Sequence, residues 1–146
     1  MTDEVVGPLA SPGFWLHHAA LTWRAELDAR LRPLGLTPTQ FMVLGSAGFL
    51  ERQAVIAPTQ QEVAEHAGAD RMMTSKIVRG LGERGLLIRD ADPQDARLLR
   101  IQLTPAGREL TEKAIAIAAE LDAQVFGNGA GGMRDALRRI AHRRFL

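Results

Sequence analysis

The 146-residue chain contains no cysteine, which excludes disulfide bonds, thiolate metal sites, cysteine nucleophiles and cysteine-based redox sensing. It also lacks any run of about 18 apolar residues of the kind that crosses a membrane. Met1–Glu4 is acidic, and no basic and then apolar secretion signal follows it. We therefore expect a cytoplasmic protein with no membrane partner.

Histidine is scarce, and the four that occur have no metal-binding spacing. None of them stands four residues from another, the distance that places two imidazoles on one helix face. They are His17, His18, His66 and His142. The sequence thus predicts no metal site and no cofactor. The length, with 46% hydrophobic and 24% charged residues, predicts a single domain spanning 1–146.

The net charge of +1 is low for a protein that binds nucleic acid, but positive charge is concentrated locally. Residues 1–69 carry four Lys and Arg against seven acids, whereas residues 70–108 carry eight against five. Residues 133–146 add five arginines and one aspartate. An electrostatic attraction to DNA depends on such local surpluses.

The hydrophobic pattern predicts a mainly α fold with a small β-wing, made of six helices and a hairpin. The helical segments are expected at about 14–34, 38–50, 59–67, 70–84, 105–126 and from Met133 onward. The strands are expected at 86–89 and 98–103, and Gly127–Gly132 is expected to be a flexible break. Thr37 with Gln40 and Thr59 with Glu62 are predicted capping boxes.

Residues 59–84 have the pattern of a helix-turn-helix, two short helices joined by a turn that contains glycine. At about 100° per residue, Met73, Ile77 and Leu81 are predicted to face the core. The opposite face presents cations, a hydroxyl and an apolar side chain suited to a thymine methyl, a mixture that fits a major groove. These residues are Arg71, Met72, Ser75, Lys76 and Arg79.

The predicted hairpin has a turn-rich, charged loop from Ala91 to Arg97. Arg97 at its end has the charge to enter a minor groove, whose negative potential attracts guanidinium. Asp95 stands two residues earlier and is placed to pair with Arg97 or to brace the turn. Each feature alone is compatible with an ordinary solvated surface, but a basic helix followed directly by a basic hairpin favours DNA binding.

At this point the sequence resembles the MarR family of winged-helix regulators. The resemblance rests on Asp92–Arg97 (DPQDAR) running into Leu103–Gly107 (LTPAG), with a helix-turn-helix upstream. Three further stretches match, namely Thr59–Ala64, Met73–Arg79 and Glu83–Leu87. Many relatives have two arginines after the wing aspartate, whereas here Ala96 stands in the first position, so fewer phosphate contacts are expected from the wing.

The resemblance implies a sequence-specific, duplex-DNA-binding transcriptional regulator, expected to be a repressor, that acts as a homodimer on a palindromic operator. It implies dimerisation helices at about 14–34 and 105–146 and a winged helix-turn-helix lobe at about 37–104. The residues expected to contact DNA are Thr59, Arg71, Met72, Ser75, Lys76, Arg79, Asp95 and Arg97.

The apolar stripes of the first and last two helices independently favour a dimer, because they are too long for one small lobe to cover. Two-fold symmetry would place two recognition helices about one DNA turn, roughly 34 Å, apart. The C-terminal arginines either contact flanking phosphates or keep an interface helix soluble, and we favour the second interpretation.

The resemblance further implies a small aromatic or anionic effector that releases the protein from DNA. Trp15, His18, Trp23 and Phe41 are candidates for the wall of its binding site, although each is also compatible with plain packing. A protein–protein adaptor that kept the fold without DNA binding is the alternative function. An enzyme is not expected, since Gly127–Gly132 lacks the context of a phosphate loop and no catalytic group has supporting neighbours.

Overall fold

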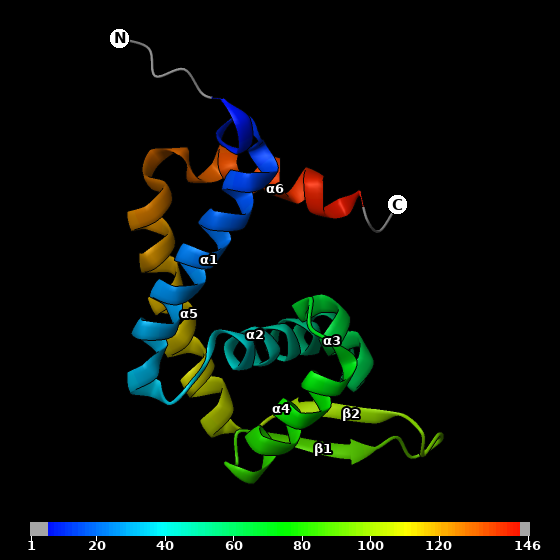
Figure 1. Ribbon diagram of the computed structural model, residues 1–146. Coiled ribbons are helices and arrows are strands. Elements are labelled where there is room, and N and C mark those ends of the chain that lie inside the picture. The colour runs from blue at the N-terminus through cyan, green and yellow to red at the C-terminus, as the bar shows by residue number, and fades with distance from the viewer. Residues whose placement is uncertain (1–5, 144–146) are drawn as a thin grey trace. The chain divides into compact units, whose positions relative to one another are not determined.

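The computed structural model describes residues 6–143, and within them it contains six α-helices and one antiparallel hairpin, as predicted (Figure 1). The elements are α1 (Pro12–Leu31), α2 (Pro38–Gln53), α3 (Gln60–Ala67), α4 (Arg71–Glu83), β1 (Leu87–Ala91), β2 (Leu99–Leu103), α5 (Pro105–Phe126) and α6 (Ala130–His142). Short 3-10 turns lie at Gly7–Ala10, Arg32–Leu34 and Gly127–Gly129. No helix among residues 6–143 is long and apolar enough to cross a membrane.

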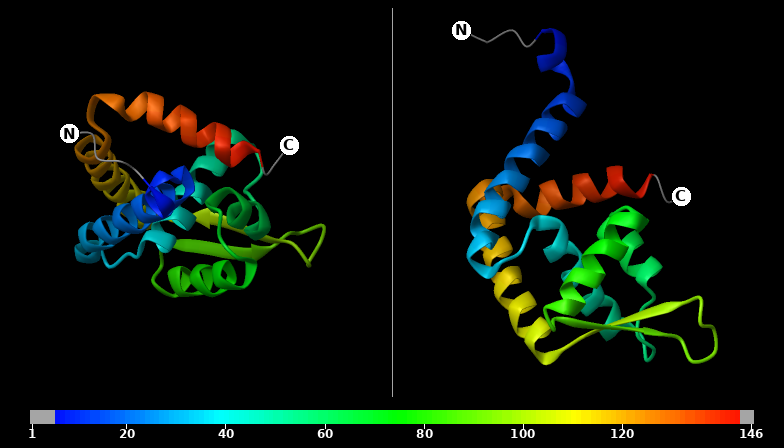
Figure 2. Two further views of the ribbon diagram at one scale, coloured as in Figure 1. Left: turned by 45° about the horizontal axis from the view of Figure 1, so that its top comes forward. Right: turned by 60° about the horizontal axis from the view of Figure 1, so that its bottom comes forward.

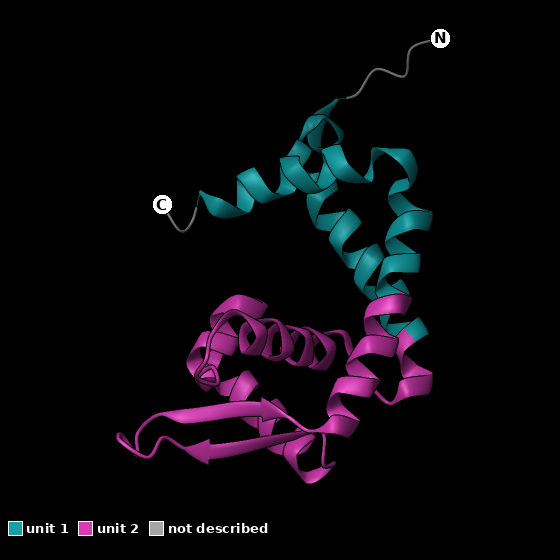
Figure 3. Cartoon of the chain, turned by 180° about the vertical axis from the view of Figure 1, so that it is seen from behind, with its two compact units in different colours: residues 1–30, 118–146 teal, residues 31–117 magenta. Residues whose placement is uncertain are grey.

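The chain divides into two compact units (Figure 3). Unit 1 combines residues 1–30 with residues 118–146, and unit 2 comprises residues 31–117. Unit 2 contains the helix-turn-helix and the hairpin, and Figure 2 shows the hairpin loop extending beyond the helices of this unit. The predicted lobe at 37–104 therefore lies within unit 2.

The helices of unit 2 begin where local capping chemistry predicts. In the capping box of α2 the Gln40 N–H donates to Thr37 Oγ1 at 3.2 Å, and the Thr37 N–H donates to Gln40 Oε1 at 3.0 Å. These bonds satisfy donors that the first turn of a helix leaves without partners. Asp70 caps α4 by accepting from the Met73 N–H at 3.0 Å. The capping predictions are confirmed.

The core of unit 2 forms around α2, which contacts α3, α4 and β2. Buried aliphatic side chains from each element meet there, so the mostly apolar sequence of α2 is explained by its central position. They are Val43, Leu44, Ala47, Val63, Val78, Leu81, Leu87, Ile101 and Leu103.

The contacts at the junction between β2 and α5 explain why Leu103–Gly107 contains a threonine and a glycine. Thr104 Oγ1 donates to the Gly85 carbonyl at 2.6 Å and accepts from the Gly107 N–H at 3.0 Å. The Thr104 N–H donates to the Leu86 carbonyl at 3.1 Å. A Cβ on Gly107 would lie 1.8 Å from the Leu86 oxygen, so only glycine fits this close approach.

In unit 1, α1 and the C-terminal part of α5 are joined by polar contacts, and each of the two helices buries a leucine. Trp23 Nε1 donates to Asp122 Oδ1 at 2.8 Å, and Arg30 contacts the side-chain oxygen of Gln124. Leu27 and Leu121 are fully buried.

Two local predictions are wrong. Of the residues predicted to form the core face of α4, Leu81 is buried and Ile77 is half-buried, but Met73 is 51% exposed. Thr74 and Val78 are buried with Leu81 and complete the core face. The packed face is thus shifted toward short side chains, which allow α4 to approach α2 and α3 closely. Gly127–Gly132 is not an irregular break, because a 3-10 turn covers Gly127–Gly129 and α6 begins at Ala130.

The ends of several elements also differ slightly from the predicted ones. The helix α1 ends at Leu31, where Pro33 follows in a 3-10 turn, and α2 continues to Gln53. The strands begin one residue later than predicted, at Leu87 and Leu99, and β1 extends to Ala91. The register of the hairpin pairs Leu87 with Leu103 and Ala91 with Leu99.

Candidate nucleic-acid interface

The second helix of the helix-turn-helix, α4, carries a largely exposed set of basic and apolar side chains. Arg71, Lys76 and Arg79 are exposed, and Met72 is 84% exposed. Ser75 is half-buried. The face predicted to meet a major groove is therefore largely accessible. The error in the predicted core face does not change this result. Met73 was expected to be buried but is exposed, and none of the residues expected to face DNA becomes buried in its place.

The loop between the strands is organised by Asp92. Its Oδ1 accepts from the backbone N–H groups of Gln94 and Asp95, at 2.8 and 3.1 Å, in the manner of an Asx turn. The Asp92 N–H donates to the Leu98 carbonyl at 2.8 Å and closes the loop. The hydrogen bond from the Arg100 side chain, followed by these backbone bonds, lowers the pKa of the Asp92 carboxyl.

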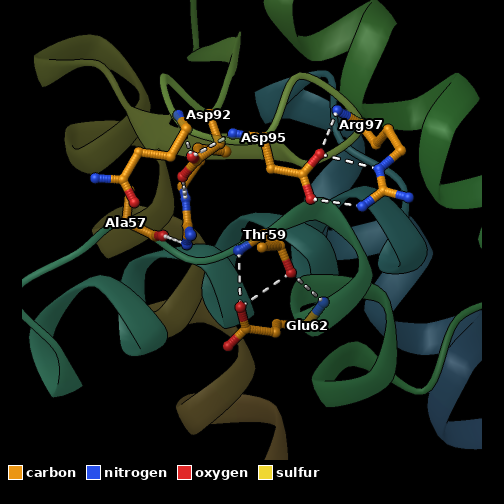
Figure 4. A network of polar contacts seen from close by, with 8 residues as sticks. Ala57, Thr59, Glu62, Asp92, Asp95 and Arg97 are labelled. Carbon is orange, nitrogen blue, oxygen red and sulfur yellow. Dashed lines mark hydrogen bonds and ion pairs between the residues drawn. The ribbon is translucent and has the colours of Figure 1, made fainter.

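Arg97 lies at the end of this loop, and its side chain is 90% exposed. Its Nε and Nη2 donate to the two carboxylate oxygens of Asp95 at 3.1 and 3.2 Å, and its backbone N–H donates to Oδ1 at 3.1 Å (Figure 4). The side-chain hydrogen bond from Arg97 is the main cause that lowers the pKa of Asp95. Asp95 thus both pairs with Arg97 and fixes its backbone.

The beginning of β2, next to the wing loop, is attached to the loop that precedes α3. Arg100 Nε donates to Asp92 Oδ2 at 2.7 Å, and Arg100 Nη1 donates to the Ala57 carbonyl at 2.7 Å (Figure 4). The Ile101 N–H donates to the Pro58 carbonyl at 2.9 Å, and Thr59 forms a β-bridge with Arg100. The sequence pattern identified Arg100 only as one cation among eight and did not predict these contacts.

Thr59 forms the capping box of α3, so its side chain is occupied. Its Oγ1 accepts from the Glu62 N–H at 3.1 Å and donates to Glu62 Oε1 at 2.9 Å, while the Thr59 N–H donates to the same carboxylate oxygen at 3.1 Å. Thr59 is only 9% exposed. Its role in the fold is to begin α3, and a contact with DNA remains a prediction.

A pocket of about 160 Å³ brings three of these elements together. The N-terminus of α3, the first residue of α4 and the end of the wing loop all contribute to its lining. The lining residues are Thr59, Gln60, Gln61, Ala64, Arg71, Arg97, Leu98 and Leu99. Arg71 and Arg97, which are separated by 26 positions in the sequence, therefore line one concavity beside the N-terminus of α3, where the helix dipole favours anions.

Comparison with known proteins agrees with this geometry. The model of the MarR family matches residues 36–99, the helix-turn-helix and most of the hairpin. An HTH-type transcriptional regulator of Bacillus subtilis, YdcH, is 32% identical over 120 residues, which cover 82% of this chain and 81% of YdcH. The chain belongs to the MarR family.

Solved structures of MarR-like proteins superpose over almost the whole chain. CouR from Rhodococcus jostii RHA1, bound to p-coumaroyl-CoA, has a TM-score of 0.78 and 29% identity, covering 92% of this chain and 94% of CouR. The Mycobacterium tuberculosis regulator MOSR, in complex with DNA, has a TM-score of 0.71 and 28% identity, covering 93% and 99%. This MarR-family protein is accordingly a DNA-binding transcriptional regulator with a winged-helix fold.

The four residues predicted to form a ligand site have different surroundings. Trp15 is 52% exposed and its Nε1 donates to the Leu9 carbonyl at 2.8 Å. The His18 ring lies 4.4 Å from that of Phe14 and 6.5 Å from that of Trp15, measured between ring centroids. Trp23 is half-buried and bonded to Asp122. Phe41 belongs to unit 2, where it is 9% exposed in the core.

No group of three or more metal-ligating side chains occurs within residues 6–143. The members of the MarR family are transcriptional regulators. Of the C-terminal arginines, Arg134 pairs with Asp135 at 3.1 Å, and Arg138 and Arg139 are exposed on α6. Arg144 lies outside the described residues, as does the acidic segment Met1–Glu4.

Proposed function

We propose that the protein is a cytoplasmic repressor that binds a palindromic operator as a homodimer and is released from it by a small aromatic or anionic ligand. The observation that carries the DNA-binding part is the common pocket of Arg71 and Arg97. It joins the start of the recognition helix to the end of the wing loop, the two elements that would enter a major groove and the neighbouring minor groove.

The chemistry of the exposed side chains supports two kinds of readout. Arg71 and Arg79 carry forked guanidinium groups that pair with guanine edges or phosphates, and Met72 offers an apolar contact to a thymine methyl. Arg97 presents its guanidinium at the end of a loop that extends beyond the helices. Phosphate contacts would provide most of the affinity, and the base-edge contacts would provide the specificity.

Uncovered apolar side chains in unit 1 support the dimer. Leu16 and Leu21 of α1 are 43% and 52% exposed, and Met133 and Ile140 of α6 are 46% and 56% exposed. A second copy that covers such faces would remove apolar surface from water at about 25 cal/mol per Å². A two-fold dimer would repeat the α4 and wing pair about one DNA turn away, which is the basis for expecting an inverted repeat.

We propose repression because a dimer seated on two adjacent major grooves would block any promoter that overlaps its operator. Release by a ligand would need only a change in the spacing of the two recognition helices. A ligand that binds one spacing better than the other shifts the population toward it. The ligand bound to CouR, p-coumaroyl-CoA, combines an aromatic ring with anionic groups and supports this choice of ligand class.

The operator can be tested by selecting duplexes from a random pool and footprinting the selected sites. We expect an inverted repeat whose half-sites are about one helical turn apart, protected on one face of the duplex. Selection of single half-sites without symmetry would contradict the dimeric operator. Ile140→Asp on α6 should weaken dimerisation in sedimentation experiments, and Gln53→Asp, at an exposed position of α2 outside the dimerisation helices, serves as the surface control.

The ligand site can be tested through intrinsic fluorescence, because the chain has only two tryptophans and both belong to the proposed wall. Addition of p-coumaroyl-CoA or of benzoate as a simple aromatic anion should change the emission and weaken operator binding over the same concentration range. Trp15→Phe and Trp23→Phe would assign the change to one ring. Release from DNA with no spectral change in either variant would place the ligand elsewhere.

A further inference from the structure

Arg100 and Arg97 stand on the same hairpin but occupy opposite environments. The Arg97 side chain is 90% exposed, whereas the Arg100 side chain is 24% exposed and its partner Asp92 is 13% exposed. A charge that is drawn into the protein and neutralised by an adjacent carboxylate attracts phosphate far less than a free cation does. Arg100 therefore contributes little to the electrostatic attraction expected from its residue type.

The bonds of Arg100 form one continuous connection between two parts of the interface (Figure 4). Nη1 donates to the carbonyl of Ala57, which stands two residues before the N-cap of α3, and Nε donates to Asp92 Oδ2. The other oxygen of Asp92 accepts hydrogen bonds from the backbone N–H groups of Gln94 and Asp95 in the wing loop. Asp95 in turn fixes Arg97.

The register of the hairpin explains why this connection forms. Arg100 pairs directly with Asp90 across the two strands. Asp92 comes two positions after Asp90, so it lies on the same face as Arg100 at the diagonal position, within reach of a long side chain. The planar fork of arginine reaches the carboxylate and the carbonyl at the same time, which an ammonium group cannot do in the same geometry.

We propose that Arg100 is a positioning residue, which fixes the wing to the loop before α3 so that Arg97 is held beside Arg71 at the common pocket. It acts on DNA affinity through Arg97 and makes no contact with DNA itself. The inference rests on the proposed DNA binding by α4 and the wing, and it adds a residue to that interface that surface exposure alone would exclude.

A double-mutant cycle on duplex binding tests this role. The contacts of Arg100 with Asp92 and Ala57 are called the clamp below. Arg100→Met should weaken binding about tenfold in the wild-type background and by less than about twofold in the Arg97→Ala background, because the clamp acts only through Arg97. Arg52→Gln removes one exposed positive charge of α2, outside the network and the dimerisation helices, and should leave affinity unchanged in both backgrounds. Equal losses in the two backgrounds would show that Arg100 contacts DNA directly and would overturn the proposal.

Amide hydrogen exchange tests the clamp without DNA. Arg100→Met and Asp92→Asn should both increase exchange at Gln94, Asp95 and Ile101, while exchange in the core of α2 stays slow. Asp92→Asn retains an oxygen for the turn and covers the case in which Arg100→Met folds poorly. Arg100→Lys should be intermediate in exchange and in affinity.

The two experiments separate the possible failures. Unchanged exchange in both variants would overturn the clamp, whether or not the protein binds DNA. If the wild-type protein shows no binding to duplex DNA at low salt, the proposed function is overturned, and the effect of Arg100 on affinity with it. Increased exchange with unchanged duplex affinity would overturn the positioning role alone.

Discussion

Arg97 donates three hydrogen bonds of 3.1 to 3.2 Å to the Asp95 carboxylate, one from its backbone N–H and two from its side chain. Arg97 is exposed and Asp95 is partly exposed, so the pair contributes little to the free energy of unfolding. We expect its role to be preorganisation, because a guanidinium already held in one orientation loses less conformational entropy when it enters a groove. Asp95 would then act on DNA binding through Arg97, as we propose that Arg100 does through Asp92.

Replacement of Arg97 should separate binding from stability. Arg97→Ala is expected to weaken duplex binding by about 1–3 kcal/mol while it leaves the free energy of unfolding nearly unchanged. Arg97→Lys keeps the charge but loses the fork that matches Asp95, so it should recover only part of the affinity. Fluorescence anisotropy with a labelled duplex and urea unfolding measure the two quantities. Equal affinity of wild type and Arg97→Ala would remove the wing from the interface.

The ion pair of Arg97 with Asp95 should make the stability of the wing depend on pH in the acid range. Because Arg97 lowers the folded-state pKa of Asp95 below its ordinary value, the pair stabilises the wing at all pH values above the ordinary aspartate pKa. That contribution is lost as the pH falls through the lowered, folded-state pKa. Desolvation of the Asp95 carboxyl and, to a smaller extent, the charge of Asp92 raise this pKa and oppose the effect. Carboxyl NMR titration should give a higher pKa for Asp95 in Arg97→Ala than in the wild type, and the same pKa in both would refute the pairing.

The two capping boxes provide a matched comparison. Thr59→Ala and Thr37→Ala should each lower the free energy of unfolding by about 1 kcal/mol, because each removes one N-cap. Only Thr59 lines the pocket that contains Arg71 and Arg97, so only Thr59→Ala should also reduce duplex affinity beyond its effect on stability. Anisotropy titrations well below the unfolding temperature test this. A loss of affinity common to both variants would assign it to stability alone.

Two glycines of unit 2 should respond to alanine with opposite signs. A Cβ on Gly107 would meet the Leu86 carbonyl oxygen at 1.8 Å and its carbon at 2.8 Å, so Gly107→Ala should destabilise by more than about 3 kcal/mol. Gly45 lies inside α2, where a Cβ would meet no neighbouring atom of residues 6–143 within 4 Å, and Gly45→Ala should stabilise by up to about 1 kcal/mol. Urea unfolding of both variants decides, and a mild effect at Gly107 would contradict the close approach.

Local rules predicted the features that depend on neighbouring residues. The Thr37 and Thr59 capping boxes and the loop between the strands require only nearby residues, and each occurs as the residue types indicate. The face of α4 was mispredicted because the choice between Met73 and Thr74 depends on how closely other elements approach. Side-chain apolarity carries no information about that distance.

The remaining differences also have non-local causes. Gly131 and Gly132 favour an irregular backbone by propensity, yet they occupy the first turn of α6, where N–H groups need no helical partner. The contacts of Arg100 depend on the register of the hairpin, and a one-residue error in a strand end is enough to hide them. The common pocket of Arg71 and Arg97 requires the whole of unit 2 to be folded.

The most direct test of the account is the salt dependence of duplex binding by the wild type and by Arg97→Ala. We predict that log affinity falls linearly with log salt concentration in both proteins, with a slope smaller by about one unit in the variant, because one cation near the phosphates has been removed. An inverted-repeat duplex should bind far more tightly than a random one of equal length. Affinity that is independent of salt, or identical for the two proteins, would contradict the proposal that α4 and the wing grip DNA.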